Sequence, residues 1–292
     1  MSDRVCFVVL HYLDFDSTVN CVESIRSLQS FDDVQVVIVD NGSSNGTGKK
    51  LILKYQNISQ IHVILNDENL GFARGNNIGY VFAKKKLCAE YICLSNNDIL
   101  IHQKGFIDLL LYKERPRFDV LGPDIYIPSS EKHQNPQRLK GYSSQELESD
   151  IAKWKLIRAI YRGFPFRIVD LFYNRLLKIL HTKPSIHKVD SVMRNIQLNG
   201  AFLIYGPHFI HNEDFAFDPR TFLYLEEDFL YHRCMRKGYV LLYDPCLKVI
   251  HNEHASTVMA SKDVVARKIS NLSYHIESAN SLLKAFKESS MN

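Results

Sequence analysis

The order of apolar and polar positions predicts alternating strands and helices over the first hundred residues. Residues 5–10 and 36–39 are short, continuously apolar and rich in β-branched side chains, which is typical of parallel strands covered on both faces. Between them, apolar residues recur at every third position and predict a helix capped by Asp16 or Ser17. The buried stripe of this helix comprises Val19, Val22, Ile25 and Leu28. Together these residues predict a β-α-β unit.

The same alternation continues and places three polar loops at one edge of a sheet. Further helices are expected at residues 49–55 and 73–85, and further strands at residues 62–65 and 91–95. A doubly wound α/β sheet of this kind binds its ligands beyond the carboxyl ends of the strands. The loops that follow predicted strands are residues 11–16, 40–46 and 96–98.

The rhythm breaks after residue 123 and resumes near residue 198. The intervening stretch opens with polar, proline-containing sequence and becomes basic and amphipathic from Ile151. Beyond it, the pattern predicts a strand region at 198–205, a helix at 222–237, strands at 239–243 and 247–250, and a last helix at 264–287.

Composition narrows the class of protein. Of 292 residues, 46% are hydrophobic, which is enough to build a full core. No apolar run approaches the roughly 18 to 20 residues that a bilayer span needs, so we expect no transmembrane helix. Strand-like sequence begins at residue 5, which argues against a cleavable secretory signal and for a cytoplasmic location. The net charge of +4 is too small to indicate a nucleic acid partner.

Two segments contain residues suited to a nucleotide. Asp40 precedes a turn rich in glycine and asparagine and could bind a base or a ribose, or it could stabilise its own loop. Residues 69–77 open a helix with glycines and amides, and Arg74 is suited to a phosphate or a base edge. An asparagine cap followed by a loop glycine would explain this segment equally well.

Candidate metal ligands follow two other predicted strands. Asp98 ends the run Asn96-Asn97-Asp98, and one carboxylate suffices for a hard divalent cation because substrate phosphates and water complete its octahedron. His251 follows an apolar strand, and mixed oxygen and nitrogen ligation favours Mn²⁺ over Mg²⁺. Taken singly, the first fragment is typical of a turn and the second of a structural histidine.

Three adjacent acids, Glu226, Glu227 and Asp228, occur early in the helix predicted at residues 222–237. Apolar and aromatic neighbours would shield them from water, which raises the proton affinity of at least one. Such an acid is a candidate general base. A solvated helix start is the alternative interpretation.

In this order, the fragments resemble the family 2 glycosyltransferases of the GT-A fold. The resemblance extends over residues 4–124 and 198–256. Its carriers are residues 39–43, 69–77, 96–98 and 199–201, the acidic run 226–228 with Arg233, and residues 249–251. It implies an α/β fold with a mostly parallel sheet, a Rossmann-like nucleotide-binding half and an acceptor-side half.

The resemblance also implies an organisation and a set of substrates. One continuous domain would contain a nucleotide-sugar-binding half (1–124), a basic amphipathic insertion (125–190), an acceptor and catalytic half (191–260) and a C-terminal helix (261–292). The donor would be a UDP- or dTDP-sugar carrying a hexose or deoxyhexose. The acceptor would be a glycan or lipid-linked glycan, in bacterial cell-surface polysaccharide synthesis.

By this likeness, specific residues acquire roles. Asp98 would be the working carboxylate of the D-x-D metal element, whose first two positions here are asparagine, and His251 would be the late metal or diphosphate ligand. Leu10 and His11 would line the nucleotide pocket by their backbone. The nucleotide-binding set would be Leu10, His11, Asp40, Asn69, Arg74 and Asn97.

The family's catalytic base lies in an acidic E-D element, which here allows two registers. Counting back six residues from Arg233 selects Glu227, which we favour, whereas matching the letters selects Asp228. Phe229 stands where one subgroup carries a further acid. The implied reaction inverts the anomeric carbon without a covalent intermediate, with Mn²⁺ or Mg²⁺ at the leaving diphosphate.

Residues 151–188 form the most basic part of the chain, with nine Lys or Arg and one acid. Apolar side chains are interleaved with the basic ones, which is typical of a helix in a membrane interface. A peripheral enzyme at the inner face of the cell membrane would use such a surface. A helical cover on the protein's own core and a subunit interface are the alternatives.

Two functions other than glycosyl transfer are also conceivable from the sequence. A dinucleotide-dependent oxidoreductase is disfavoured because the first β-α loop, residues 11–16, contains no glycine that would let backbone amides close on a pyrophosphate. A non-catalytic nucleotide-sugar-binding scaffold stays open, because residues 96–98 contain a single acid.

Overall fold

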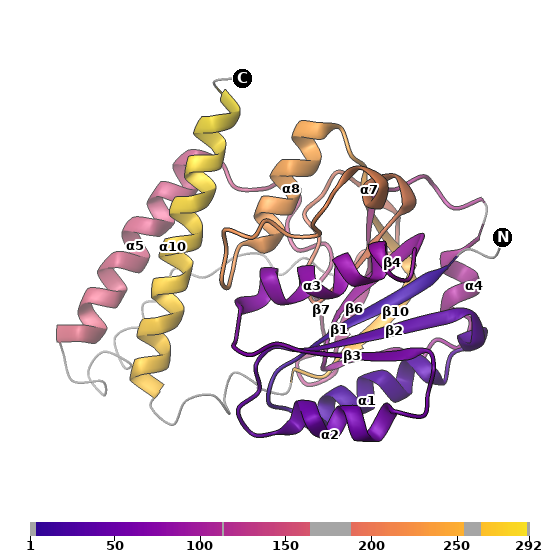
Figure 1. Cartoon of the computed structure of the whole chain (residues 1–292). Coiled ribbons are helices and arrows are strands. Elements are labelled where there is room, and N and C mark those ends of the chain that lie inside the picture. The colour runs from indigo at the N-terminus through magenta and orange to yellow at the C-terminus, as the bar shows by residue number, and fades with distance from the viewer. Residues whose placement is uncertain (1–3, 113, 164–187, 254–263, 291–292) are drawn as a thin grey trace.

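A curled, mostly parallel sheet lies at the centre of the chain (Figure 1). The computed structural model describes residues 4–112, 114–163, 188–253 and 264–290. Within them, ten strands have the order β3-β2-β1-β4-β9-β6-β10-β5, with β7 paired to β6 and β8 paired to β10. The strands are β1 (Val5–His11), β2 (Val34–Asp40), β3 (Ile61–Leu65), β4 (Tyr91–Asn96), β5 (Ile99–Leu100), β6 (Val120–Ile127), β7 (Lys132–His133), β8 (Met193–Arg194), β9 (Phe202–Tyr205) and β10 (Leu241–His251).

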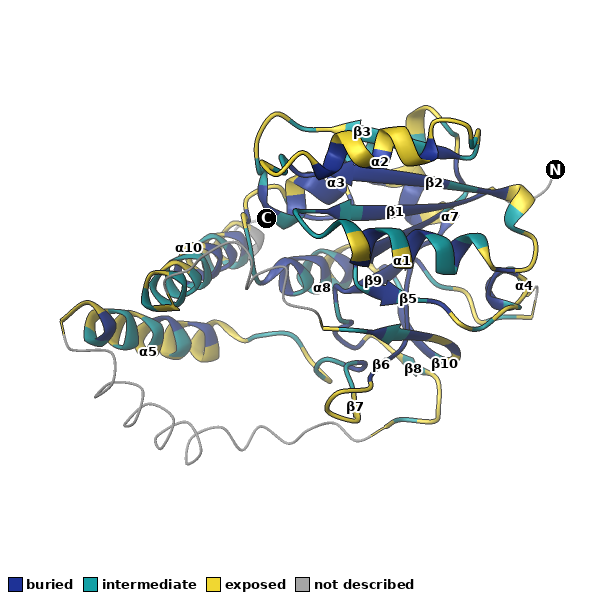
Figure 2. Cartoon of the chain, turned by 90° about the horizontal axis from the view of Figure 1, so that it is seen from below, coloured by how far each residue is buried: buried dark blue, intermediate teal, exposed yellow. Residues whose placement is uncertain are grey.

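The helices cover both faces and one end of this sheet (Figure 2). Those described are α1 (Phe15–Arg26), the 3₁₀ turn η1 (Phe31–Asp33), α2 (Thr47–Tyr55), α3 (Gly71–Lys85), α4 (Phe106–Leu110), α5 (Ser144–Gly163), α7 (Pro207–Asn212), α8 (Glu226–Lys237) and α10 (Val264–Ser290). Among the described residues, no helix is both long and apolar enough to cross a membrane.

The long strands of the sheet share one direction and therefore end at one edge. β1 runs parallel to both β2 and β4, and β6 runs parallel to β10. β9 is antiparallel to both β4 and β6, so β4 and β6 point in the same direction. The carboxyl ends of β1, β2, β4, β6 and β10 are the place where polar loops can meet.

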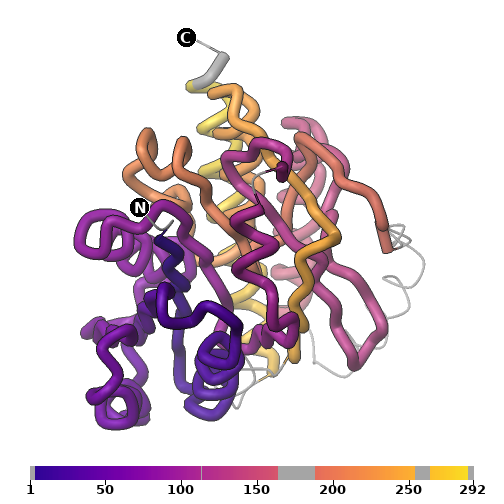
Figure 3. The backbone as a smooth tube through the Cα atoms, turned by 90° about the vertical axis from the view of Figure 1, so that its right-hand side faces the viewer, coloured from indigo at the N-terminus to yellow at the C-terminus, as the bar shows by residue number. Residues whose placement is uncertain are grey.

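Alternate residues of each central strand enter two different apolar clusters. In β1, Val5, Phe7 and Val9 pack with α1, α2 and α4 on one face. Cys6 and Val8 pack on the other face with α3, α7 and α8. Because both faces are covered, the strand is continuously apolar, as the sequence predicts for a parallel sheet. The N-terminal elements gather on one side of the body and the later ones on the other (Figure 3).

α5 and α10 lie side by side next to α8 (Figures 1 and 2). The ring of Trp154 on α5 lies 5.0 Å from the ring of His275 on α10, centroid to centroid. The apolar cluster at this junction comprises Leu147, Ile151, Leu225, Phe229, Ala279, Leu282 and Ala285. The described part of the basic segment thus turns its apolar stripe toward α10, and residues 164–187 lie outside the described residues.

The first helix begins earlier than expected. α1 starts at Phe15, and its cap is Asp14, whose Oδ1 accepts a hydrogen bond from Ser17 N at 3.1 Å. The cap expected at Asp16 or Ser17 is wrong, because Leu13 adopts a left-handed backbone (φ 62°) that turns the chain just ahead of Asp14.

β6 and β10 are continuous where the pattern indicates interruptions. The two strands expected after residue 238 form the single strand β10, which has a bulge after Asp244. Nothing in the pattern predicts β6, because Gly122 and Pro123 interrupt its apolar run. Pro123 lies opposite Asp244 at the bulge, where a missing amide is tolerated. The expected division after residue 124 falls inside this strand.

α8 begins at Glu226 rather than at residue 222. Tyr224 and Leu225 have φ values of 73° and 67°, which no right-handed helix allows. The four residues ahead of the acidic run are therefore an irregular segment, which places the acids in the first turn of α8.

Candidate active site

The side chain of His11 joins three loops at the carboxyl edge of the sheet. Its Nδ1 lies 2.6 Å from Thr18 Oγ1 in α1, and its Nε2 lies 2.8 Å from Thr47 Oγ1 at the start of α2. Asn97 Nδ2, just after β4, donates to the same Thr18 oxygen at 3.1 Å. Burial lowers the pKa of His11, so the ring is neutral and enclosed. His11 is fully buried and its carbonyl accepts a hydrogen bond from Asn41 N at 2.9 Å, so a ligand at this edge would meet the half-buried Leu10 first.

Asp40 ends β2 and supports the loop that follows it. The residue is 5% exposed, and its Oδ1 accepts a hydrogen bond from Ser43 N at 3.1 Å. A Cβ at Gly48 would lie 1.9 Å from Asp40 Oδ2, so a glycine is needed where α2 approaches. Asp40 therefore stabilises its own loop, whether or not it also contacts a nucleoside.

Asn41 is the centre of the neighbouring loop, although the sequence pattern assigns it no role. Its Nδ2 donates to Asn69 Oδ1 and to Gly71 O, both at 3.0 Å. Arg74 is exposed, and its Nε donates to Pro219 O at 3.0 Å. The loop that carries Asn69 is thus held to β2, while Arg74 connects α3 with the segment that leads to α8.

Asp98 and His251 face each other at the ends of β4 and β10. Asp98 Oδ1 lies 3.1 Å from His251 Nε2, and both side chains are about one tenth exposed. His251 Nδ1 lies 2.7 Å from Gln134 Oε1, and the amide of Gln134 donates to Glu253 Oε1 at 3.1 Å. This fixes the amide orientation, so His251 donates through Nδ1 and directs Nε2 toward the carboxylate.

This pair fits a divalent cation. Asp98 Oδ1 is buried, accepts no hydrogen bond from the described residues and lies 3.1 Å from His251 Nε2. A shared cation or proton is the arrangement that such a pair requires. Across the described ranges, no group of three or more His, Cys, Asp or Glu side chains converges, so the protein would supply two ligands and leave the others to phosphate and water. Gln134 is a supporting residue that sequence reasoning missed.

The acidic run occupies the first turn of α8 and its members differ in exposure. Glu226 and Asp228 are 3% and 6% exposed, whereas Glu227 is half-buried. Burial raises the pKa of Glu226 to about 8, with a further contribution from the charge of Glu227. Burial also raises the pKa of Glu227, whose Oε1 accepts a hydrogen bond from Gly200 N at 3.1 Å. Glu227 is the member of the run that water or a substrate can reach.

A short series of hydrogen bonds connects Glu227 with the Asp98–His251 pair. Gly200, which binds Glu227, precedes Ala201, and Ala201 O accepts a hydrogen bond from Asn96 N at 2.9 Å. Asn96 ends β4, two residues before Asp98. A Cβ at Gly200 would lie 2.7 Å from Glu227 Oε1, which explains the glycine. The acidic run and Asp98 therefore lie at the same edge of the sheet.

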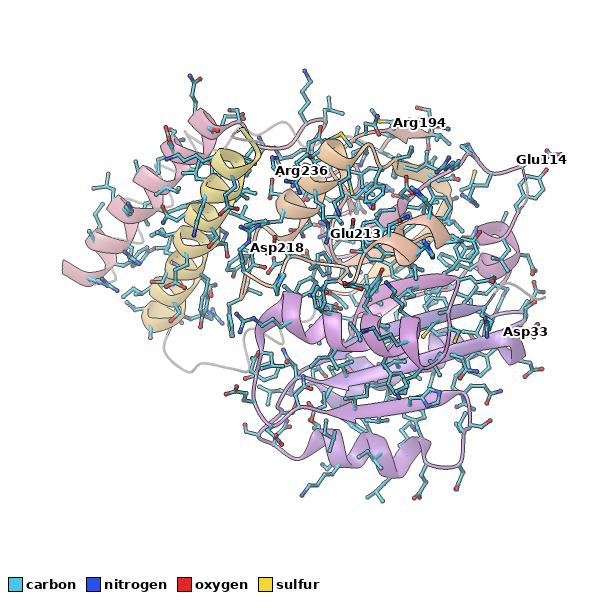
Figure 4. All side chains as sticks on the ribbon, turned by 45° about the horizontal axis from the view of Figure 1, so that its top comes forward. Asp33, Glu114, Arg194, Glu213, Asp218 and Arg236 are labelled. Atoms are coloured by element: carbon cyan, nitrogen blue, oxygen red, sulfur yellow. The ribbon has the colours of Figure 1, made fainter. Side chains whose placement is uncertain are left out.

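Ion pairs fix the segment between α7 and α8, on which Glu213 and Asp218 lie (Figure 4). Asp218 pairs with Arg220 at 2.7 Å, and Glu213 pairs with Lys237 at 2.6 Å. Arg233 on α8 donates to Phe215 O at 3.0 Å. Arg233 thus acts on the backbone of this segment, which leads directly into the acidic run.

The sheet and the polar loops at its edge define the class of protein. A curled, mostly parallel α/β sheet, with polar loops at its carboxyl edge and additional helices, is the Rossmann-like GT-A fold. The family model for Glycosyl transferase family 2 matches residues 6–175, more than half of the chain. The chain belongs to that family, which confirms the resemblance drawn from its motifs.

The chain also resembles a distantly related hexosyltransferase. The chain is 23% identical over 125 residues to the low-salt glycan biosynthesis hexosyltransferase Agl10 of Haloferax volcanii. The match covers 43% of this chain and 38% of the relative, so it spans well under half of the relative's length.

Proposed function

We propose that the chain transfers a sugar from a nucleoside diphosphate donor to an acceptor hydroxyl, with inversion at the anomeric carbon. The observation that carries this proposal is the shared edge of the Asp98–His251 pair and Glu227, linked through Asn96 and Gly200. A departing diphosphate needs positive charge beside it, and an attacking hydroxyl needs a base. Family membership supports the same reaction class.

The donor nucleotide would lie over the loops that follow β1, β2 and β4. Hydrogen bonds of His11 to Thr18 and Thr47, and of Asn97 to Thr18, hold these loops in a fixed relation, so a nucleotide would meet a preformed surface. Arg74 has an exposed guanidinium suited to a phosphate or a base edge. The proposed nucleotide contacts are Leu10, His11, Asp40, Asn69, Arg74 and Asn97.

Asp98 and His251 would hold a divalent cation, Mn²⁺ or Mg²⁺, together with the donor phosphates. When bound, the cation would offset the negative charge that develops on the leaving diphosphate. Gln134 holds the imidazole of His251 in the tautomer that presents Nε2 to a ligand.

Glu227 would act as the general base. Its raised pKa gives it a high proton affinity, and it is the most exposed of the three acids. The acceptor oxygen would bond to the anomeric carbon as its proton passes to the Glu227 carboxylate. The bond from the anomeric carbon to the diphosphate oxygen would break in the same displacement, which inverts the configuration. Asp228 is the second candidate for this role, and Glu226 would tune the charge of both.

The substrates are proposed at a finer level from the family and from the relative. The relative is described as a hexosyltransferase of glycan biosynthesis, which supports a hexose or deoxyhexose and a glycan acceptor. UDP- and dTDP-sugars are the proposed donors, and cell-surface polysaccharide synthesis is the proposed setting.

A lipid-linked acceptor would bring the protein to the inner face of the cell membrane. The exposed side of α5 supports peripheral contact there, because it mixes basic and apolar side chains. In its second half the exposed members include Lys153, Lys155, Leu156 and Arg162, whereas the first half exposes Glu146 and Glu148.

A donor screen tests the proposed function. The purified chain is incubated with UDP- and dTDP-sugars, an acceptor glycan, and Mn²⁺, Mg²⁺ or a chelator, and released nucleoside diphosphate is measured. We expect metal-dependent transfer that Glu227→Gln abolishes. The alternative, a non-catalytic nucleotide-sugar-binding scaffold, is favoured by the single acid in residues 96–98. Sugar binding without turnover, unchanged in Glu227→Gln and Asp228→Asn, would establish that alternative instead.

A further inference from the structure

The segment 222–225, directly before the acidic run, has a backbone that its own residues disfavour. Tyr224 and Leu225 have φ values of 73° and 67°. Bulky side chains seldom adopt this left-handed conformation, so two of them in succession disfavour this backbone. Contacts from elsewhere must therefore hold the segment that sets the position of Glu227.

α10 supplies a contact to every residue of the 222–225 segment. The partners on α10 lie at positions 274, 275, 278 and 282, which recur on one face of a helix. The contacts are the rings of Phe222 and Tyr274 (4.9 Å, 26°), Ser278 Oγ donating to Leu223 O (3.0 Å), the rings of Tyr224 and His275 (3.7 Å, 21°), and Leu225 in one apolar cluster with Ala279 and Leu282.

The opposite side of the same segment touches the donor half. Phe222 O accepts a hydrogen bond from Phe72 N at 2.7 Å, at the start of α3. Gly71 has φ 82°, and a Cβ there would lie 2.2 Å from Phe222 O, so a glycine is needed for this approach. The 222–225 segment is thus enclosed between α3 and α10, and its last residue leads into α8.

His275 contacts aromatic rings of two other elements. Its ring lies 3.7 Å from the ring of Tyr224 and 5.0 Å from the ring of Trp154 on α5, centroid to centroid. Its Nδ1 lies 2.8 Å from Asn271 O within α10. Burial lowers the pKa of His275, which keeps the stacked ring neutral at ordinary pH. α5 therefore also packs against the residue of α10 that contacts Tyr224.

We propose that α10 is a positioning clamp for the acceptor base, with Tyr274 and His275 as positioning residues that act on Glu227 through the 222–225 segment. The inference rests on the proposed function, in which Glu227 takes the acceptor proton. The clamp fixes the first turn of α8 relative to the start of α3, and so fixes the base relative to the donor loops.

The test compares Tyr274→Ala and His275→Ala with two matched variants in the full chain. Tyr274→Phe keeps the ring that stacks on Phe222. Tyr161→Ala removes a buried side chain at the α5–α10 junction, where Lys268 Nζ donates to Tyr161 Oη at 3.2 Å, six residues before Tyr274. For each protein, kcat, KM for the donor, thermal midpoint and deuterium uptake of the amides of residues 226–230 are measured.

We expect kcat to fall about tenfold in the two alanine variants, while KM for the donor stays within about twofold, because only the base is displaced. Amide exchange in residues 226–230 rises in both. Tyr274→Phe restores parental values, and Tyr161→Ala lowers the thermal midpoint without changing kcat or local exchange.

Two results would overturn the clamp: parental kcat and exchange in both Tyr274→Ala and His275→Ala, or an equal loss of kcat in Tyr161→Ala at the same thermal midpoint. Failure of the proposed function is a separate outcome, in which the parent protein itself shows no transfer with any donor. In that case the exchange measurement still decides whether α10 holds the first turn of α8.

Discussion

The proposed donor side, formed by the loops after β1, β2 and β4, and the proposed acceptor side, formed by Gly200 and the first turn of α8, hold their polar residues in different ways. On the donor side, successive β-α units bring loop ends together, and His11 and Asn97 need only short side chains to meet through Thr18. On the acceptor side, Glu227 depends on Gly200, 27 residues earlier, and on contacts that α10 makes to the preceding segment. A repeating topology positions the first set, whereas individual contacts position the second. Substitutions should therefore disturb the acceptor side without disturbing the sheet.

Of the substitutions that test this difference, Glu227→Gln should reduce kcat the most. The amide oxygen can still accept from Gly200 N, but the side chain cannot take a proton, so kcat should fall about 100- to 10,000-fold while KM for the donor changes little. Steady-state release of nucleoside diphosphate measures both constants. Asp228→Asn is the matched variant, with an expected loss of about tenfold or less. The opposite ranking of the two variants would assign the base to Asp228.

Gln134→Ala tests the Asp98–His251 pair, which joins the end of β4 to the end of β10. Without the amide, His251 loses the partner of its Nδ1, so we expect Mn²⁺ affinity to fall about 10- to 100-fold. Calorimetric titration of Mn²⁺ in the presence of nucleoside diphosphate measures the change. Gln137→Ala is the control, because the bond described for Gln137 is to Gln197. Equal affinity in both variants would remove Gln134 from the site.

The sequence predicts the donor side well for a physical reason. Parallel strands covered on both faces must be apolar throughout, so β1 and β2 could be located, and the shared direction of such strands places Asp40 and Asp98 at one edge. Glycosyl transferase family 2 could also be recognised from the motifs in these loops.

The acceptor side could be predicted only in part. Strand β6 is hidden by Gly122 and Pro123, which fit because β10 bulges opposite them. Asn41 and Gln134 carry no distinctive local pattern, since their partners are found only when the chain has folded. The left-handed backbone at Tyr224 is likewise invisible in a pattern that continues the α8 periodicity, because tertiary contacts override it.

Gly200→Ala should have a smaller effect than loss of the base itself. The added Cβ would lie 2.7 Å from Glu227 Oε1 and displace the carboxylate, so we expect kcat to fall about tenfold with an unchanged KM for the donor. Gly163→Ala provides the control, since nothing lies within 4 Å of a Cβ there. Steady-state kinetics of the two proteins decide the matter, and a parental kcat in Gly200→Ala would mean that the carboxylate acts from another position.

Substitution of Glu226 should give the smallest effect, a change in the pH dependence of the free energy of unfolding. It tests how far this acid on the proposed acceptor side is buried. Burial raises the pKa of Glu226 from 4.5 to about 8, so between these values the folded protein holds a proton that the unfolded chain releases. The stabilising contribution of protonated Glu226 is complete below its unfolded pKa, and it is lost as pH rises through about 8.

Glu226→Gln should remove this pH dependence. The variant should match the parent near about pH 4.5 and exceed its free energy of unfolding by on the order of 1 kcal/mol at about pH 8.5. Urea denaturation at both pH values measures the difference. Glu68→Gln, at an exposed position on the donor side, should leave the parental pH dependence unchanged. If Glu226→Gln also leaves it unchanged, Glu226 is solvated in the folded protein, and the acceptor side is as open to water as the donor loops.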